Sequence, residues 1–269
     1  MKTRVISVCV ALPIFLAVMF FAPKWGFALM YSAVSVIAQH ELLYATGIVR
    51  NKLVVGIAMV FAAYVPFWVL WGMRPGIALL LLWALVVVLF IIRMVNETYT
   101  FTQIAVTLFS IIIPPLFLSL ALIIRVQTGW RAMILLPFLA AWMSDTGACL
   151  SGTYLGRHKL CEKISPKKTV EGAVGGVLGG IIGGILYWLV MTFVFNLSVS
   201  IWFLILLGGL GSVFAQIGDL MFSAIKREHG IKDYGMLMPG HGGVLDRFDS
   251  AILTTPLTVM LLYFIPFFV

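Results

Sequence analysis

Long runs of apolar residues are the feature that most constrains how this chain can fold. Segments such as 77–95 and 174–195 contain at most one charged residue, and a helix of about 20 apolar residues spans the hydrocarbon core of a bilayer. The runs lack the alternation of polar and apolar residues that is typical of a barrel strand. Hydrophobic residues make up 62% of the chain and charged residues only 10%, which is too apolar for one soluble core. The sequence therefore predicts an all-α, polytopic integral membrane protein.

We expect nine membrane-spanning helices. Their predicted ranges are 5–22, 26–45, 53–71, 77–95, 104–124, 132–153, 174–195, 201–223 and 251–268. The first range resembles a signal peptide, but it is long and no small-residue cleavage site follows it, so we expect it to be retained. With the N-terminus inside, alternate loops leave only four of the 18 basic residues outside, namely Lys24, Arg74, Arg125 and Arg131. Because basic loops stay in the cytoplasm, we predict a cytoplasmic N-terminus and an external C-terminus.

Acidic residues are concentrated in the second half of the chain. Apart from Glu41 and Glu97, which lie near the ends of predicted spans, all of them fall between residues 145 and 249. We therefore interpret residues 1–100 as N-terminal membrane scaffold helices, and we expect neither early acid to contribute to chemistry. Residues 101–269 are predicted to form a catalytic membrane domain with cytoplasmic loops at 154–173 and 224–250.

The eighth predicted span carries a polar face. Ser212, Gln216, Asp219, Ser223 and Lys226 recur at steps of four, three, four and three residues, which places them on one side of a helix. A carboxylate at membrane depth is costly unless it is paired, metal-bound or hydrated, so Asp219 is a candidate functional residue. The structural alternative is an ion pair between Asp219 and Lys226 or another base.

The sixth predicted span also carries polar residues at membrane depth, Ser144 and Asp145, which can be functional or structural. Both residues are candidates for substrate binding, and both could instead link neighbouring helices through hydrogen bonds. The sequence leaves these two interpretations open.

The stretch PGHGGVLDRFDS, residues 239–250, joins acids to glycines and bases. Asp246 and Asp249 are three residues apart at the start of the ninth span, so they share a helix face. With Asp219 they supply the oxygen ligands that Mg²⁺ prefers. Gly242 and Gly243 allow close backbone approach, and amides near a helix N-terminus favour anionic oxygens. Four bases surround these acids, which indicates a site for a metal-bound polyphosphate. The bases are Lys226, Arg227, Lys232 and Arg247.

Residues 223–249, SAIKREHGIKDYGMLMPGHGGVLDRFD, resemble the signature of the CDP-diacylglycerol synthases, also called phosphatidate cytidylyltransferases. The positions in register are Ser223, Lys226, Arg227, Lys232, Asp233, Gly235, His241, Gly242, Gly243, Asp246, Arg247 and Asp249. Met238 departs conservatively from the Leu, Ile or Phe that is more frequent in the family. Upstream, SDTGACLSGTYLGRHKLCEKISPKKTVEG resembles the second conserved region of the same family. The resemblance is strong over residues 140–255 and elsewhere extends only to hydropathy.

The resemblance implies a Mg²⁺-dependent enzyme that converts CTP and phosphatidate into CDP-diacylglycerol and pyrophosphate. We predict Asp219, Asp246 and Asp249 as metal ligands, and these three with Lys226 and Arg247 as catalytic residues. The predicted substrate-binding residues are Ser144, Asp145, Lys167, Lys168, Ser223, Arg227, Lys232, His241, Gly242 and Gly243. We expect an inner (plasma) membrane location, a cytoplasmic active site and no nucleic-acid partner. The sequence does not decide whether a monovalent cation assists Mg²⁺.

Glycines in EGAVGGVLGGIIGG, residues 171–184, form two rows at steps of four. Such small-residue seams let helix backbones pack closely in lipid. The sequence does not distinguish simple packing from contact with the catalytic span or with a second copy in a homodimer.

Three other functions agree less well with these residues. A CTP-dependent polyprenol or phytol kinase would use a similar metal site, but the completeness of the match over 223–249 argues against it. A cation-coupled transporter would also place acids in its spans, yet it would not need His-Gly-Gly bracketed by bases. A CDP-alcohol phosphotransferase is disfavoured because its pattern of Asp-Gly, Ala-Arg and spaced aspartates is not found.

Overall fold

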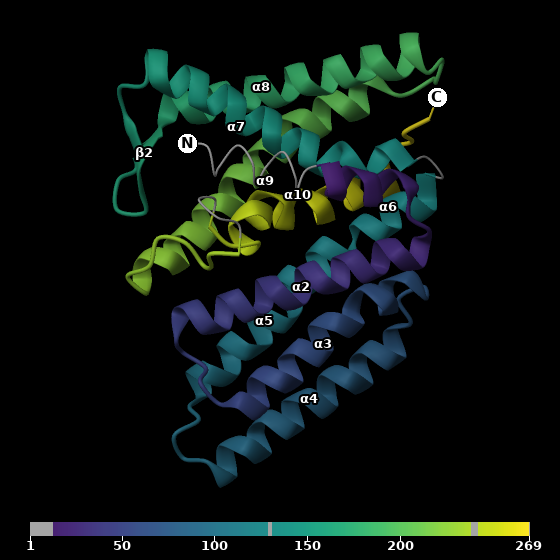
Figure 1. The fold of residues 1–269 in the computed structure, drawn as a ribbon. Helices are drawn as coiled ribbons and strands as arrows, with labels where there is room; N and C mark the ends of the chain where they lie inside the picture. The colour runs from purple at the N-terminus through teal and green to yellow at the C-terminus, as the bar shows by residue number, and fades with distance from the viewer. Residues whose placement is uncertain (1–12, 129–130, 238–241, 269) are drawn as a thin grey trace. The chain divides into compact units, whose positions relative to one another are not determined.

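A computed structural model describes residues 13–128, 131–237 and 242–268 of the chain (Figure 1). Residues 13–21 are helical. The helices that follow are α2 (Lys24–Thr46), α3 (Lys52–Leu70), α4 (Pro75–Val95), α5 (Phe101–Ser119), α6 (Ala121–Thr128), η1 (Arg131–Leu135), α7 (Leu136–Leu155), α8 (Val170–Leu189), η2 (Val190–Val194), α9 (Ile201–Glu228) and α10 (Leu245–Phe264). The strands β1 (Lys159–Cys161) and β2 (Ser165–Thr169) form an antiparallel hairpin between α7 and α8.

The described residues include six helices that are long and apolar enough to cross a membrane. They span Lys52–Leu70, Pro75–Val95, Phe101–Val126, Arg131–Leu155, Val170–Val194 and Ile201–Glu228. The prediction of an all-α integral membrane protein is therefore confirmed. Residues 13–21, α2 and α10 overlap the other three predicted spans. The count of nine spans and the sides of the termini stay predictions.

The chain forms two compact units, of which the first contains Met1–Ile123 and Asp233–Arg247. Its helices α2, α3 and α5 pack on one another around a core that includes Ala58, Leu89 and Ile104. Helix α5 begins with a capping box in which Thr100 and Gln103 exchange hydrogen bonds. The Gln103 amide also donates to the Ile48 carbonyl at 2.6 Å, which ties the start of α5 to the loop before α3.

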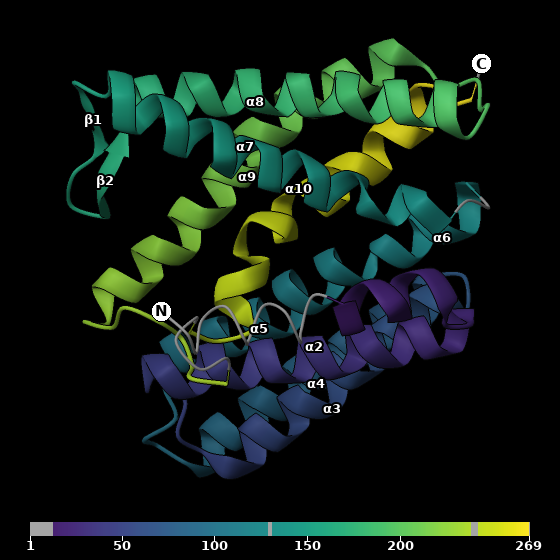
Figure 2. The same ribbon diagram turned by 45° about the horizontal axis from the view of Figure 1, so that its top comes forward.

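The second unit contains Ile124–Lys232 and Phe248–Val269. Helix α8 packs along α7 and α9, and the β1–β2 hairpin extends from the shared end of α7 and α8 (Figure 2). From Phe248 onward, α10 packs on α7. The Phe248 and Phe138 rings meet edge to face at 5.9 Å, and the Thr254 hydroxyl donates to the Pro137 carbonyl at 3.1 Å.

The polar loops are shorter than the sequence predicts. Helix α9 continues to Glu228, beyond the predicted end at 223, and it stops where Gly230 adopts a left-handed φ of 66°. Helix α10 begins at Leu245 rather than at 251. Hydropathy detects the apolar part of a helix, whereas helical hydrogen bonds continue through polar turns at the membrane surface. The division at residue 100 between scaffold helices and a catalytic domain stays a prediction.

Candidate active site

Helix α9 carries all five residues of the predicted polar face. Ser212 and Lys226 are buried, and Asp219 is partly exposed. The Ser212 hydroxyl donates to the Gly208 carbonyl one turn earlier, at 2.7 Å. A polar group buried in hydrocarbon is costly without a partner. The partners of this polar face on other elements therefore indicate whether each residue is structural or belongs to an active site.

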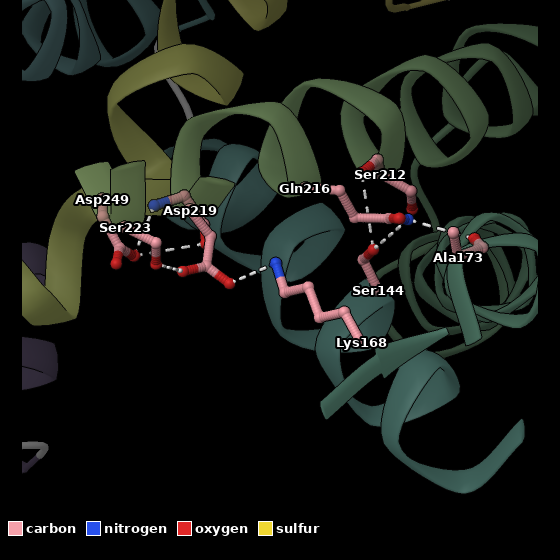
Figure 3. Close-up of polar contacts among 9 residues, drawn as sticks. Ser144, Lys168, Ala173, Ser212, Gln216, Asp219, Ser223 and Asp249 are labelled. Atoms are coloured by element: carbon pink, nitrogen blue, oxygen red, sulfur yellow. Dashed lines mark hydrogen bonds and ion pairs between the residues drawn. The ribbon is translucent and has the colours of Figure 1, made fainter. Parts of the chain in front are cut away.

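Asp219 lies between a hydroxyl and an ammonium group. The Ser223 hydroxyl donates to its Oδ1 at 3.2 Å, and Lys168 Nζ lies 2.5 Å from its Oδ2 (Figure 3). Lys168 belongs to β2, so the hairpin delivers a base to the middle of the polar face. The two side chains are 27% and 29% exposed, and solvent therefore reaches the pair. An ion pair was the structural alternative for Asp219, and its partner is Lys168.

Asp249 is a buried carboxylate in the same unit. It lies beside Ser223 and Asp219 of α9 (Figure 3). Its Oδ1 accepts from the Ser250 amide at 2.7 Å. Helix α10 approaches α9 closely here: a Cβ on Gly218 would lie only 2.6 Å from the Asp249 carbonyl oxygen, so the glycine allows this approach. Asp249 thus joins Asp219 and Ser223 in one polar cluster (Figure 3).

Ser144 links helices through hydrogen bonds. Its hydroxyl accepts from Gln216 Nε2 at 3.3 Å and donates to the Ser212 carbonyl at 3.5 Å (Figure 3). Gln216 also donates to the Ala173 carbonyl at 3.1 Å, which joins α9 to α8 as well as to α7. These contacts favour the helix-linking interpretation of Ser144. Asp145, the next residue, is exposed.

The glycine rows of α8 meet two different helices. A Cβ on Gly179 would lie 2.6 Å from the Met143 carbonyl of α7. A Cβ on Gly180 would collide with the Ser212 hydroxyl and the Gly208 carbonyl of α9. The row of Gly175, Gly179 and Gly183 therefore packs on α7, whereas the other row meets α7 at Gly172, both helices at Gly176, and α9 at Gly180 and Gly184. Packing within the chain accounts for the seam, and a homodimer stays a prediction.

The hairpin that carries Lys168 is held at both ends. At its base, Glu171 accepts from the Arg157 amide at 3.0 Å and lies 2.6 Å from His158 Nδ1. At its turn, Arg227 Nε donates to the Ile164 carbonyl at 3.2 Å, and a second guanidinium nitrogen donates to Ile231. Arg227 was predicted to bind substrate, and in this structure it braces the hairpin.

In the other unit, Asp246 organises the segment before α10. Its Oδ2 accepts from the Tyr234 amide at 2.8 Å and from the Gly243 amide at 3.0 Å. Gly242 adopts a φ of 82°, which only glycine adopts readily. A Cβ there would also lie 2.9 Å from Asp246 Oδ2. Turn geometry and close packing thus both require glycine at position 242.

The remaining predicted residues differ in exposure. Lys167, Lys232 and Arg247 are exposed, whereas Lys226 is buried. His241 lies outside the described residues. The roles of all these residues in binding or catalysis stay predictions.

No three His, Cys, Asp or Glu side chains are gathered for one metal ion within the described ranges. Mg²⁺ is commonly held by one or two carboxylates together with substrate phosphates, so a complete protein cage is not required. Asp219, Asp249 and the Ser223 hydroxyl supply hard oxygen donors, and Lys168 shows that a cation is attracted to Asp219. The donor set fits Mg²⁺.

Sequence reasoning missed three contributors. Gln216 was assigned to the polar face, but its bonds to two other helices could not be foreseen. Glu171 lies in the second region that resembles the family, and the resemblance implies no role for it. Glu41 was assigned to the scaffold, yet its carboxylate is 7% exposed and accepts from the Val244 amide at 3.0 Å. Only its acidic character in an apolar helix marked it as unusual.

Comparison with known proteins places the site in a family context. The family described as "Cytidylyltransferase family" matches residues 2–265. Proteins named phosphatidate cytidylyltransferase from Staphylococcus haemolyticus, Staphylococcus epidermidis and Staphylococcus aureus are 43%, 45% and 42% identical over 129 residues. Each alignment covers 48% of this chain and 48% of the relative. The chain thus spans about half the length of the curated relatives it matches.

Proposed function

Because this chain belongs to the cytidylyltransferase family, we propose that it transfers the cytidylyl group of CTP to phosphatidate, forming CDP-diacylglycerol and pyrophosphate. The observation that carries the proposal is the Asp219 cluster. Asp219, a carboxylate on a membrane helix, lies beside a second carboxylate, Asp249, and a lysine from a polar hairpin, Lys168 (Figure 3). The relatives that carry the name phosphatidate cytidylyltransferase support the choice of substrates.

The proposed reaction needs little proton transfer. A phosphate oxygen of phosphatidate attacks the α-phosphorus of CTP, the bond from that phosphorus to the bridging oxygen breaks, and pyrophosphate leaves. The phosphate nucleophile is already anionic. Catalysis therefore consists mainly of alignment and charge stabilisation.

Each charged group has a proposed task in this reaction. Asp219, Asp249 and Asp246 would hold Mg²⁺, which when bound stabilises negative charge on phosphoryl oxygens. Lys226, Lys232 and Arg247 would neutralise the triphosphate and the departing pyrophosphate. Lys168 would exchange its carboxylate partner for a substrate phosphate, because its ammonium is partly exposed.

We place this chemistry at the cytoplasmic face of the inner membrane. The support is the excess of Lys and Arg in the loops that carry residues 157–168 and 226–247. CTP reaches the site from the cytoplasm, and phosphatidate presents its headgroup from the inner leaflet. A homodimer stays a prediction that native mass spectrometry would test.

A labelling experiment tests the proposed reaction. Purified protein is incubated with phosphatidate, Mg²⁺ and CTP that carries label in either the α- or the γ-phosphate. We expect α-label, and no γ-label, in the lipid fraction, and we expect chelation with EDTA to abolish transfer. Transfer of γ-label alone would identify a CTP-dependent kinase and refute the proposal.

A further inference from the structure

Glu41 is a buried carboxylate for which the proposed reaction has no use. It lies near the end of α2, and only 7% of its surface is exposed. Its two oxygens accept hydrogen bonds from consecutive backbone amides, those of Val244 at 3.0 Å and Leu245 at 2.8 Å. These amides are more than 200 residues away in sequence and open α10. A carboxylate at this place also complements the positive end of the helix dipole.

Two glycines leave room for the Glu41 side chain. A Cβ on Gly235 would lie 2.8 Å from the Glu41 carboxyl carbon, and a Cβ on Gly243 would lie 2.6 Å from it. Neither glycine adopts a positive φ, so backbone conformation alone would permit another residue at both positions. The carboxylate is therefore the physical reason why these two positions of the Gly235–Asp246 segment carry no side chain.

Asp246 accepts from the same run of amides. It takes the Gly243 amide at 3.0 Å, and Glu41 takes the next two. Two carboxylates thus hold three consecutive N–H groups, which fixes both the turn and the direction in which α10 begins. Hydrogen bonds to ionised acceptors are about twice as strong as neutral ones.

We infer that Glu41 is a positioning residue for the active site, because it fixes the backbone of residues 243–245 and thereby places Asp246. This inference rests on the proposed function, in which Asp246 takes part. Glu41 does not contact substrate in this scheme. It acts through the segment that it holds, from a scaffold helix whose acid the sequence gives no reason to connect with chemistry.

Three substitutions test how strongly Glu41 holds the backbone of residues 243–245. Glu41→Gln keeps the shape but leaves one acceptor where there were two, and it points an amide group at one N–H. Glu41→Ala removes both acceptors. Glu97→Ala is the matched control, because Glu97 is an exposed acid near the end of α4. Losing an acceptor for a buried amide changes an equilibrium by roughly 10- to 100-fold.

Hydrogen exchange on the detergent-solubilised full chain tests the contact directly. In peptides that cover residues 242–247, we expect exchange about tenfold faster in Glu41→Gln and faster still in Glu41→Ala. Peptides from α8 should be unchanged, as should every peptide of Glu97→Ala. Unchanged protection at 242–247 in folded Glu41→Gln would overturn the inference. This readout does not depend on which reaction the protein catalyses.

A double-mutant cycle tests the effect on catalysis. In monodisperse protein, kcat should fall at least tenfold in Glu41→Ala and by an intermediate factor in Glu41→Gln. Gly235→Ala should lower kcat in the natural background, because the new methyl group displaces the carboxylate, but should have little further effect in Glu41→Ala. Independent, multiplying effects would overturn the inference. If α-label never enters lipid with the natural protein, the proposed function fails, and the exchange experiment still decides the role of Glu41.

Discussion

Asp219→Asn is the substitution that best separates a catalytic carboxylate from a structural ion pair. The change keeps the side-chain shape and retains an oxygen for the Ser223 hydroxyl, which lies 3.2 Å from Oδ1. It removes the charge that faces Lys168 Nζ at 2.5 Å. Because the Lys168 side chain is 27% exposed, its ammonium can turn to water, and the loss in unfolding free energy should be about 1 kcal/mol or less.

The expected loss of activity is larger than this cost in stability. Removing one electrostatic stabiliser typically lowers kcat by about 10²- to 10³-fold, which corresponds to about 3–4 kcal/mol in the transition state. The assay follows α-label from CTP into lipid in detergent micelles, alongside thermal unfolding of the same preparation. We expect a melting temperature within a few degrees of the natural protein.

Lys168→Gln is the matched control, since it breaks the same ion pair and leaves the carboxylate in place. We expect this variant to raise the KM for CTP more than it lowers kcat. If Asp219 serves only as a structural partner, both substitutions should lower stability equally and leave kcat near normal. That result would refute the assignment of Asp219 to the active site.

Two further predictions follow from the packing. Asp246→Asn should lower kcat by at least about 10²-fold, because it removes the charge while the remaining oxygen can still accept from both the Tyr234 and Gly243 amides, as Oδ2 does; near-normal turnover in the label-transfer assay would remove Asp246 from the site. Gly180→Ala should destabilise the protein by about 1–3 kcal/mol, since its Cβ would meet α9 backbone. Thermal unfolding in detergent measures this effect, with Gly56→Ala as the control because nothing lies within 4 Å of its Cβ. Equal melting temperatures for these two alanine variants would contradict the seam argument.

Features that depend on neighbouring residues in sequence could be predicted well. The apolar runs predicted membrane helices because the bilayer core selects for length and hydrophobicity residue by residue. The polar face of α9 followed from helical periodicity alone, and Asp219 and Ser223, four residues apart, do form a hydrogen bond. The glycine rows predicted close helix packing, although the sequence could not tell which helices they would meet.

Contacts between distant segments could not be predicted in the same way. Lys168 was placed among many basic residues of a polar loop, and nothing in its local sequence distinguishes it from Lys167. The register of the hairpin decides which of the two lysines faces Asp219. Thr169 pairs with Lys159 at the base, and Lys168 then lies 2.5 Å from Asp219. Register is a property of two strands, so it could not be read from either strand alone.

Glu41 shows the same limit more sharply. The sequence by itself determined that the protein is a membrane protein, which helix carries its central acid and that the glycine rows of residues 171–184 form a close-packing seam, because each of these depends on local composition or on spacing along one helix. Only the tertiary structure decided that Glu41 holds the first amides of α10, that Lys168 faces Asp219, and that Ser144 and Gln216 link three helices. The physical reason is that a charged or polar group at membrane depth requires a partner, but the sequence around that group does not specify which helix supplies the partner.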